Sequence, residues 1–377
     1  MKKHKEIMDN GKKTHLPKGW KMMMFEEVCE KIFAGGDKPK KISKNKTKEF
    51  FIPIYANGEK NKGLYGYTNH EKVKKPSITI SGRGTIGYSE IRTEPFVPIV
   101  RLITLIPNKK IVNINFLHYG IKNIDFSNTG TSIPQLTIPM IKNYTIPIPP
   151  LSEQKRIVAI LDKAFQAIDQ AKAHTEQNLK NAKEVFESYL NGIFEKGKEK
   201  IESGEWEERK IGEILTLEYG KPLHKSKRTS KGKYPVYGAN GIKAYSNEFH
   251  HNKKTVIIGR KGTVGAIHLS DKKFWPLDVT YYAVFDEKII NLYFLYYLLS
   301  KLHLPKLAKG VKPGINRNDV YKIKVTIPSL IEQKQIVAQL DELQAKTQGL
   351  EKLYQQKIVN LEELKKSILK KAFRGEL

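Results

Sequence analysis

Two long segments of the chain carry apolar side chains at helical spacing and contain almost no residue that interrupts a helix. Residues 152–191 contain no Pro or Gly, and residues 330–377 are interrupted in mid-segment only by Gly349. In both segments apolar-leaning positions follow one another in steps of four and three over about four heptads, which predicts coiled-coil helices. The predicted seam of the first segment is Ile157, Leu161, Ala164, Ile168, Ala171, Thr175, Asn178, Ala182, Val185 and Tyr189; that of the second is Ile336, Leu340, Leu343, Thr347, Leu350, Tyr354, Lys357, Leu361, Leu364 and Ile368.

The ends of these helices have sequence signals of their own. Ser152 is the predicted N-cap of the first helix, with Glu153 near the positive end of the helix dipole, and Gly192 stands where a C-terminal glycine is expected. In the second helix Ile331 replaces the serine, so Ser329 is the expected cap. At about 1.5 Å per residue, each helix is predicted to be a rod on the order of 60 Å long.

The chain contains one internal repeat, which organises all of it. Residues 149–162 return as residues 328–341 at a constant offset of 179, and shorter echoes follow upstream, at residues 53–58 and 235–241 and at residues 84–87 and 262–265. Trp20 and Trp206 open the two copies. Each copy is therefore predicted to be a globular domain of short apolar runs, Gly, Pro and basic clusters, followed by a helix.

This pattern predicts an α+β protein with two mixed globular domains and two helical spacers. The expected boundaries are a first domain at 1–151, a first spacer at 152–198, a second domain at 199–329 and a second spacer at 330–377. Taken alone, long amphipathic helices are also typical of dimerisation or spacer elements. Because both helices belong to one chain and alternate with similar domains, we expect an antiparallel intrachain pair, with Asn178 and Lys357 fixing its register.

The charge of the chain points to a polyanionic partner. The sequence has 67 Lys and Arg against 39 Asp and Glu, a net charge of +28 and a pI near 9.7. Of the 28 excess charges, 25 lie on the two predicted globular domains. Such a balance favours nucleic acid as a partner.

Other classes of protein fit the composition poorly. Cys29 is the single cysteine, so an intrachain disulfide and a zinc site with two thiolates from this chain are both excluded. No run of 18 apolar residues occurs, which argues against membrane spanning, and no apolar region follows the basic start as it would in a signal peptide. We expect a cytoplasmic protein.

Each globular domain carries a lysine-rich loop at a matching distance after its opening tryptophan. A lysine run is most often a solvated surface, but its recurrence in both copies favours a shared electrostatic role in DNA binding, with phosphate contacts providing affinity and dissimilar neighbours reading bases. The candidate DNA-binding residues are Lys38, Lys40, Lys41, Lys44, Lys46 and Arg83 in the first copy, and Lys221, Lys225, Lys227, Arg228, Lys231, Arg260, Lys261 and Arg317 in the second.

Several short motifs imitate catalytic or cofactor sites without the context that those sites need. Residues 82–87 match a dinucleotide-binding glycine pattern, but prolines follow where a helix is required, so we predict a tight turn between strands here and at residues 259–265. Residues 192–198 spell G-x-x-x-x-G-K, yet Glu199 stands where Mg²⁺ chemistry needs Ser or Thr. Asp278, Asp286 and Lys288 only loosely resemble a nuclease arrangement, and the histidines have no metal-ligand spacing. We expect no catalytic residue, no metal and no cofactor.

The repeated boxes at 149–162 and 328–341, the G-T-x-G turns and the closing residues 372–377 together resemble the specificity (S) subunit of type I restriction-modification systems. The resemblance covers essentially the whole chain, although the first copy of the closing motif is degraded, with Leu190, Asn191 and Gly192 opposite Phe373, Arg374 and Gly375. It implies two target recognition domains, related by pseudo-two-fold symmetry about two antiparallel helices. It also implies double-stranded DNA, two methyltransferase (M) subunits and restriction (R) subunits as partners of a subunit that is not itself an enzyme.

Because the two domains differ at most positions, the expected DNA site is bipartite and asymmetric, with each domain reading a few base pairs through the major groove. If both domains approach one face of the duplex, the half-site centres lie about 34 Å apart. Two alternatives remain at this point. A coiled-coil scaffold with basic domains would bind DNA without sequence preference, and a nuclease would cleave DNA with a metal.

Overall fold

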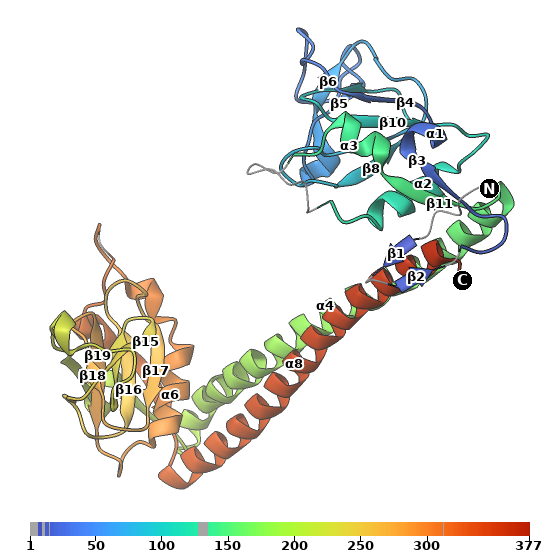
Figure 1. The fold of residues 1–377 in the computed structure, drawn as a ribbon. Helices are drawn as coiled ribbons and strands as arrows, with labels where there is room; N and C mark the ends of the chain where they lie inside the picture. Colours follow the sequence, from blue (N-terminus) through green and yellow to red (C-terminus); the bar gives the residue numbers. More distant parts are fainter. Residues whose placement is uncertain (1–6, 10–11, 15, 127–134, 312) are drawn as a thin grey trace. The chain divides into compact units, whose positions relative to one another are not determined.

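The computed structural model describes residues 7–9, 12–14, 16–126, 135–311 and 313–377. The chain divides into two compact units, unit 1 with residues 1–175 and 357–377 and unit 2 with residues 176–356. Two long helices contribute to both units, α4 (Leu151–Glu202) and α8 (Leu330–Arg374) (Figure 1). We call the part of unit 1 that precedes α4 head 1, and the part of unit 2 between α4 and α8 head 2.

Head 1 is built on an antiparallel four-stranded sheet with the strand order β4-β10-β7-β8. A three-stranded sheet, β6-β5-β9, contains the parallel pair β5·β9, and β11 pairs with β3. A short hairpin, β1-β2, precedes them. The strands are β1 (Ile7–Asp9), β2 (Lys12–Thr14), β3 (Lys21–Met24), β4 (Cys29–Ala34), β5 (Ile52–Tyr55), β6 (Leu64–Thr68), β7 (Ser77–Ile80), β8 (Ser89–Arg92), β9 (Val97–Pro98), β10 (Ile103–Pro107) and β11 (Thr145–Ile148).

Head 2 repeats these three sheets strand for strand, with the orders β13-β19-β16-β17, β15-β14-β18 and β12-β20. Its strands are β12 (Glu207–Lys210), β13 (Leu215–Tyr219), β14 (Tyr234–Gly238), β15 (Gly241–Ser246), β16 (Thr255–Gly259), β17 (Ile267–Ser270), β18 (Trp275–Pro276), β19 (Thr280–Phe285) and β20 (Lys324–Ile327). The sequence repeat is therefore a repeat of topology.

The short helices of the two heads also correspond. Asn113 and Asn291 cap α2 and α6, each side-chain oxygen accepting hydrogen bonds from two backbone N–H groups of the first helical turn. The helices are α1 (Phe25–Val28), α2 (Ile114–Lys122) and α3 (Ile138–Asn143) in head 1, and α5 (Ile211–Ile214), α6 (Leu292–Lys301) and α7 (Arg317–Tyr321) in head 2; single 3₁₀ turns lie at Lys60–Gly63, Lys225–Lys227 and Leu304–Leu307.

The core of each unit combines a head with one end of each long helix. In unit 1 the ring of Phe116 on α2 lies 4.9 Å from that of Phe373 on α8, and in unit 2 the ring of Phe294 on α6 lies 5.6 Å from that of Phe194 on α4. All four side chains are buried. Burial of apolar and aromatic surface is the main favourable contribution to folding. The helices α4 and α8 therefore belong to the folded core of each unit.

The repeated box supplies polar contacts that join each helix to its head. The buried amide of Gln154 donates to the carbonyl oxygens of Pro149 and Ile111, at 2.8 and 3.0 Å, and its oxygen accepts from the N–H of Asn113 at 2.7 Å. The buried Gln333 makes the same three bonds in unit 2, donating to the carbonyl oxygens of Pro328 and Ile289 and accepting from the N–H of Asn291. The aspartates of the box complete the contact, since Tyr119 donates to Asp162 and Tyr297 donates to Asp341.

The long helices pair in opposite directions. In unit 1 the first half of α4 meets the last part of α8, with Lys172 Nζ 2.5 Å from Glu362 Oε1. In unit 2 the end of α4 meets the start of α8, with Lys200 Nζ 2.9 Å from Glu332 Oε1. The predicted antiparallel intrachain pair is confirmed, and with it the predicted fold class.

The predicted ends of the first helix were wrong. Gly192 lies inside α4, which continues to Glu202, and the glycine after its end is Gly204, with φ +75° and its N–H bonded to the carbonyl of Ile201. That left-handed conformation costs glycine little, so it identifies the true terminus. Ser152 is a helical residue, because α4 begins at Leu151; Ser329 does cap α8, its hydroxyl accepting from the N–H of Glu332.

The closing motif of the first copy also lies elsewhere than expected. Phe194, and not Leu190, makes the aromatic contact that Phe373 makes in the other unit. The counterpart of Gly375 is Gly204, since both have φ +75° and the N–H of each bonds to a carbonyl three residues earlier, that of Ala372 in one unit and that of Ile201 in the other. The motif is therefore displaced toward the end of α4.

The predicted seam holds over the first half of α4 and then shifts by one residue. Leu161 and Thr175 are buried, but Val185 and Tyr189 are exposed, and Leu190 is buried instead. An α-helix has 3.6 residues per turn, so its buried stripe drifts by about 20° per heptad from a strict 3.5 repeat.

Asn178 and Lys357, predicted to fix the register of the helix pair, are both exposed, so this prediction was wrong. The buried polar residues of the helices include Thr175 and Thr347, and their hydroxyls donate to carbonyl oxygens of their own helix. Within the described residues, no helix is both long and apolar enough to cross a membrane.

Candidate nucleic-acid interface

A glycine turn of the same geometry links β7 to the edge strand β8 in head 1 and β16 to the edge strand β17 in head 2. In head 1 the N–H of Gly87 bonds to the carbonyl of Ser81 at 3.0 Å, and in head 2 the N–H of Gly265 bonds to the carbonyl of Gly259 at 2.7 Å. Strands β8 and β17 follow these turns, so the predicted tight turns are confirmed and no nucleotide-binding helix follows either of them.

The hydrogen bonds of the turns align the two copies residue by residue. The carbonyl of Gly82 accepts from the N–H of Leu136, and the carbonyl of Arg260 accepts from the N–H of Ile315. Arg260 thus occupies the place of Gly82, and the exposed Arg83 corresponds to the exposed Lys261. This agrees with the sequence alignment of residues 84–87 with residues 262–265.

In head 1 the turn arginine lies beside a cationic hollow. Arg83 donates through Nε and Nη2 to the Gln135 side-chain oxygen, at 3.2 and 2.9 Å. A cavity of about 670 Å³ is lined by Arg83, Lys38 and Arg101, together with Asp37 and other residues. The structure therefore brings two of the candidate residues, Lys38 and Arg83, together, and adds Arg101, which the sequence reasoning missed.

The Val100–Arg101 pair at the edge of this hollow has a strained backbone. Both residues have positive φ, 51° and 60°, and Val100 is 55% exposed. A β-branched residue in this region is uncommon, and such strain concentrates at functional sites. The Asn57 side chain holds the pair by donating to the carbonyl of Val100 at 2.7 Å.

In head 2 two candidate arginines converge on one tyrosine. The guanidinium carbons of Arg260 and Arg317 lie 5.3 and 5.0 Å from the centre of the Tyr219 ring, a distance at which cation–π attraction operates. Tyr219 was not predicted. It ends β13 and is 46% exposed, so one aromatic side chain and two cations meet at the surface.

The lysine-rich loops are solvent-exposed, as a phosphate-binding surface requires. Lys227 is ion-paired to Glu248, and Arg228 is partly buried with its guanidinium bound to the carbonyl of Leu223 at 2.7 and 3.1 Å. These two side chains are less available to DNA than the others. The exposed candidates are Lys38, Lys40, Lys41, Lys44 and Lys46 in head 1 and Lys221, Lys225, Lys227, Lys231 and Lys261 in head 2.

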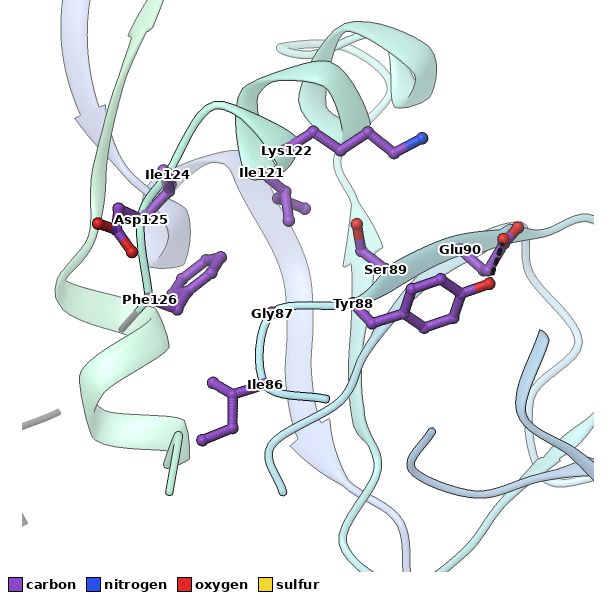
Figure 2. Close-up of a pocket in the computed structure, with 10 residues that line it drawn as sticks. All are labelled: Ile86, Gly87, Tyr88, Ser89, Glu90, Ile121, Lys122, Ile124, Asp125 and Phe126. Atoms are coloured by element: carbon purple, nitrogen blue, oxygen red, sulfur yellow. Dashed lines mark hydrogen bonds between the residues drawn. The ribbon is translucent and has the colours of Figure 1, made fainter. Parts of the chain in front are cut away.

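A second cavity of head 1, of about 590 Å³, has a different character. Figure 2 shows it between the end of the glycine turn and the end of α2, with the Tyr88 hydroxyl directed at Glu90, to which it donates at 2.7 Å. Burial, together with Glu90, raises the pKa of Tyr88 to about 12. Its lining combines Lys122 with the carboxylates of Glu90 and Asp125, so it lacks the uniform positive charge that a phosphate-binding surface needs.

The residues that loosely resembled a nuclease site take part in local hydrogen bonds of head 2. Asp286 Oδ1 accepts from the N–H of Lys288 at 2.9 Å in the turn before α6, and the carbonyl of Asp278 accepts from Arg260. In the part of the chain that the structure describes, no group of three or more His, Cys, Asp or Glu could hold a metal ion.

Comparison with known proteins follows the same division of the chain. Residues 17–181 and 203–360 each match the family model described as the type I restriction modification DNA specificity domain. The chain belongs to the type I restriction-modification specificity subunits. The two matches cover most of the sequence, one for each repeat, and they confirm the resemblance found in the sequence.

Specificity subunits of several organisms are similar to this chain. A Mycoplasma pneumoniae protein named as a type I specificity subunit is 33% identical over 45% of this chain and 50% of its own length, and a second one from that organism is 31% identical over 47% and 48%. The chain thus spans about half the length of these relatives. The MjaIX specificity subunit of Methanocaldococcus jannaschii is 25% identical over 96% of this chain and 94% of its own.

Solved structures share the specificity-subunit fold. A chain from a study of complex assembly and conformational transition of the type I R-M system superposes with a TM-score of 0.76 at 20% identity, covering 96% of this chain and all of that one. The HsdS subunit of Thermoanaerobacter tengcongensis superposes with a TM-score of 0.61 at 19% identity, covering 96% and 98%. At these identities the similarity establishes the fold.

Proposed function

We propose that this specificity subunit recognises a bipartite, asymmetric sequence in double-stranded DNA, one half-site for each head. One observation carries the proposal. Two heads of the same topology present different side chains at equivalent places around their glycine turns, with Arg83 and Arg101 in head 1 and Arg260, Arg317 and Tyr219 in head 2. Each base pair presents its own pattern of hydrogen-bond donors and acceptors in the major groove. Two heads with the same topology but different polar side chains are therefore suited to recognising two different base sequences.

The charge distribution supports DNA as the partner. The excess positive charge lies on the heads, and the lysine-rich loops expose it to solvent. In this proposal the lysines, Lys261 included, contact phosphates and supply affinity that falls steeply with salt. Arg83 and Arg317 supply the contacts to bases. Arg260 adds positive charge at the Tyr219 ring that Arg317 also contacts, and Arg228 stabilises its own loop.

The reaction itself belongs to partner subunits in this proposal. Two methyltransferase subunits bind the chain, flank the DNA and flip an adenine out of the stack, and restriction subunits join them to cleave. The chain positions these subunits and contributes no catalytic residue and no cofactor. Because such a complex acts on DNA inside the cell, the proposal places the chain in the cytoplasm.

A footprint tests the proposal against a coiled-coil scaffold that binds any DNA. The chain, in complex with the methyltransferase subunit of its own system, is bound to a fragment that this complex methylates, and hydroxyl-radical cleavage maps the protected bases. We expect two protected blocks about one helical turn apart. We also expect binding at least about 10³-fold tighter than to scrambled DNA. One continuous block, or equal affinity for both fragments, would favour the scaffold.

A charge-matched pair of variants makes the footprint specific to one head. Lys38→Ala with Lys40→Ala removes two exposed cations from the predicted DNA loop of head 1, and Lys109→Ala with Lys110→Ala removes two exposed cations from another loop of that head. The first pair is expected to weaken one protected block, and the second to leave both blocks intact. Equal effects of the two pairs would mean that net charge alone decides binding.

The nuclease alternative has its own test. The purified chain incubated with DNA and Mg²⁺ is expected to leave the DNA intact. Metal-dependent cleavage that disappears in Asp286→Ala would overturn the proposal that the chain is not an enzyme.

A further inference from the structure

Head 2 holds an aromatic side chain between two arginines at its surface. Tyr219 comes from the end of β13, Arg260 from the glycine turn and Arg317 from the first residue of α7. The sheet and the turn bring these three positions together although the sequence separates Tyr219 from Arg317 by almost a hundred residues. The ring of Tyr281 lies edge-on behind Tyr219, with the ring centres 5.0 Å apart, and the Tyr281 hydroxyl is anchored on the carbonyl of Ile315 at 3.0 Å.

Both guanidinium groups are fixed in place before any ligand binds. Arg260 donates through Nε and Nη2 to the carbonyl of Asp278, at 3.2 and 2.8 Å, and Arg317 donates through Nη1 to the carbonyl of Leu217 at 3.1 Å. Neither forms an ion pair with a carboxylate among the residues that the structure describes. Two cations are thus held at one ring without a neutralising partner, an arrangement that favours an electron-rich ligand.

The geometry of Arg317 leaves its bidentate edge available. The bond to Leu217 uses Nη1, so Nε and Nη2 point along the other side of the planar guanidinium. That edge matches two acceptors on one planar group, as on a phosphate or on the O6 and N7 atoms of guanine. Flexible lysines on the exposed loops already provide for phosphates, whereas an arginine held by backbone and ring contacts is suited to discriminating between bases.

Head 1 lacks every component of this cluster while keeping the same fold. Pairing in the two central sheets aligns Tyr219 with Ala34, because Ala34 pairs with Ile103 as Tyr219 pairs with Tyr281. The turn aligns Arg260 with Gly82, and the first residue of α3, Ile138, stands where α7 begins with Arg317. The cluster is therefore not required for the architecture, which points to a role in recognition that only head 2 has.

We infer that Tyr219, Arg260 and Arg317 form a guanine-reading site in head 2, with Arg317 donating to guanine O6 and N7. Arg260 and Tyr219 are positioning residues that hold the plane of the Arg317 guanidinium. The inference rests on the proposed function and names one base of the half-site that head 2 reads. Head 1 reads its half-site with different residues, so the cluster affects one half of the target only.

Methylation mapping of variants tests this inference. A host expressing the chain with its methyltransferase partner is sequenced for methylated adenines, first with the natural chain, which gives the motif, and then with Arg317→Ala, Arg317→Lys and Tyr219→Ala. A guanine is expected in one half-site. Each variant is expected to relax that position alone, with about 10- to 100-fold less discrimination against the other bases for Arg317→Ala. Tyr219→Phe keeps the ring and is expected to restore the preference that Tyr219→Ala loses.

Control variants and outcomes separate this inference from the proposed function. Arg209→Ala removes an arginine of β12, a strand outside the cluster, where Arg209 is ion-paired to Glu207 of the same strand. This variant is expected to leave the motif unchanged. If Arg317→Ala and Arg317→Lys lower methylation evenly at all sites with the motif intact, the cluster binds phosphate and the inference is wrong. If the natural chain yields no bipartite motif at all, the proposed function fails instead. Should Arg317→Ala be too unstable to act, Arg317→Lys decides alone, and an unaltered base preference there refutes guanine reading.

Discussion

Replacing the buried glutamine of the second box, Gln333→Ala, is expected to destabilise unit 2 strongly and unit 1 hardly at all. The Gln333 amide donates to the carbonyl oxygens of Pro328 and Ile289, at 2.9 and 3.1 Å, and its oxygen accepts from the N–H of Asn291 at 2.7 Å. The residue is fully buried. Alanine would leave three backbone groups without these partners, in a place that offers water little access.

The size of the effect follows from these three bonds. A hydrogen bond contributes about 1 kcal/mol net, and a buried group left without its partner costs about 1 to 3 kcal/mol. Because backbone carbonyls recover part of this by relaxation, we expect a loss of about 3 to 5 kcal/mol in the free energy of unfolding, the range of the largest single-residue effects. Asn291 also caps α6, so the start of that helix is expected to open first.

Hydrogen exchange at increasing urea, read by mass spectrometry, assigns the loss to one unit. Peptides of head 2 are expected to exchange at lower urea in Gln333→Ala, and peptides of head 1 are expected to keep their protection. Gln335→Ala is the matched control, because Gln335 is exposed two residues away on the same helix. A free energy for Gln333→Ala within about 1 kcal/mol of the control would refute the reasoning.

Three further predictions follow from particular contacts. Gly197→Ala places a Cβ 2.3 Å from the Trp206 ring and should lower the free energy of unfolding of unit 2 by about 1 to 3 kcal/mol. Gly192→Ala adds a Cβ where no atom lies within 4 Å and should stabilise α4 by about 0.5 to 1 kcal/mol. Thermal unfolding in which Gly197→Ala is not the less stable of the two variants would contradict the contact between Gly197 and Trp206. Burial raises the pKa of Tyr281 to about 12 from an ordinary value of 10, so the neutral phenol stabilises the fold below pH 10 and this stability is lost as the pH rises from 10 to 12. Urea titrations between pH 10 and pH 12 should show a smaller loss of stability in Tyr281→Phe than in the natural chain. An equal loss in both proteins would contradict the raised pKa of Tyr281. Deleting one turn of α8 between Thr347 and Lys357 shortens that helix by about 6 Å. If the helix length sets the distance between the two half-sites, the number of unspecified base pairs between them in the methylated motif should change, and an unaltered number would contradict this dependence.

The architecture could be predicted from the sequence where the signal was periodic or repeated. The box at residues 149–162 and its copy, the steps of four and three, and the glycine turns each depend on local spacing, and the structure places helices and turns there. The ends of α4 were less predictable. Gly192 has the residue type of a terminus, but only the backbone shows that the left-handed residue is Gly204.

The cluster that we propose to read a base lies beyond what the sequence could indicate. Arg260 and Arg317 were candidates on charge alone, and no local pattern marked Tyr219, because the three meet only through sheet pairing and the start of α7. The predicted seam of α4 was wrong in the second half of the helix because the drift of the buried stripe is a property of the helix geometry and is not visible in the residue pattern. A strict heptad pattern predicts positions 185 and 189, whereas the geometry of an α-helix moves the stripe to the half-buried Phe186 and the buried Leu190.

Single-molecule sequencing of methylated adenines in a host with and without this gene tests the central claim most directly. With the gene present, we expect one methylated motif made of two specified blocks of different sequence, separated by base pairs that are not specified, and we expect that motif to vanish when the gene is deleted. Methylation that is the same in both strains, or a gene-dependent motif that is continuous or palindromic, would contradict a subunit that reads DNA with two unlike heads.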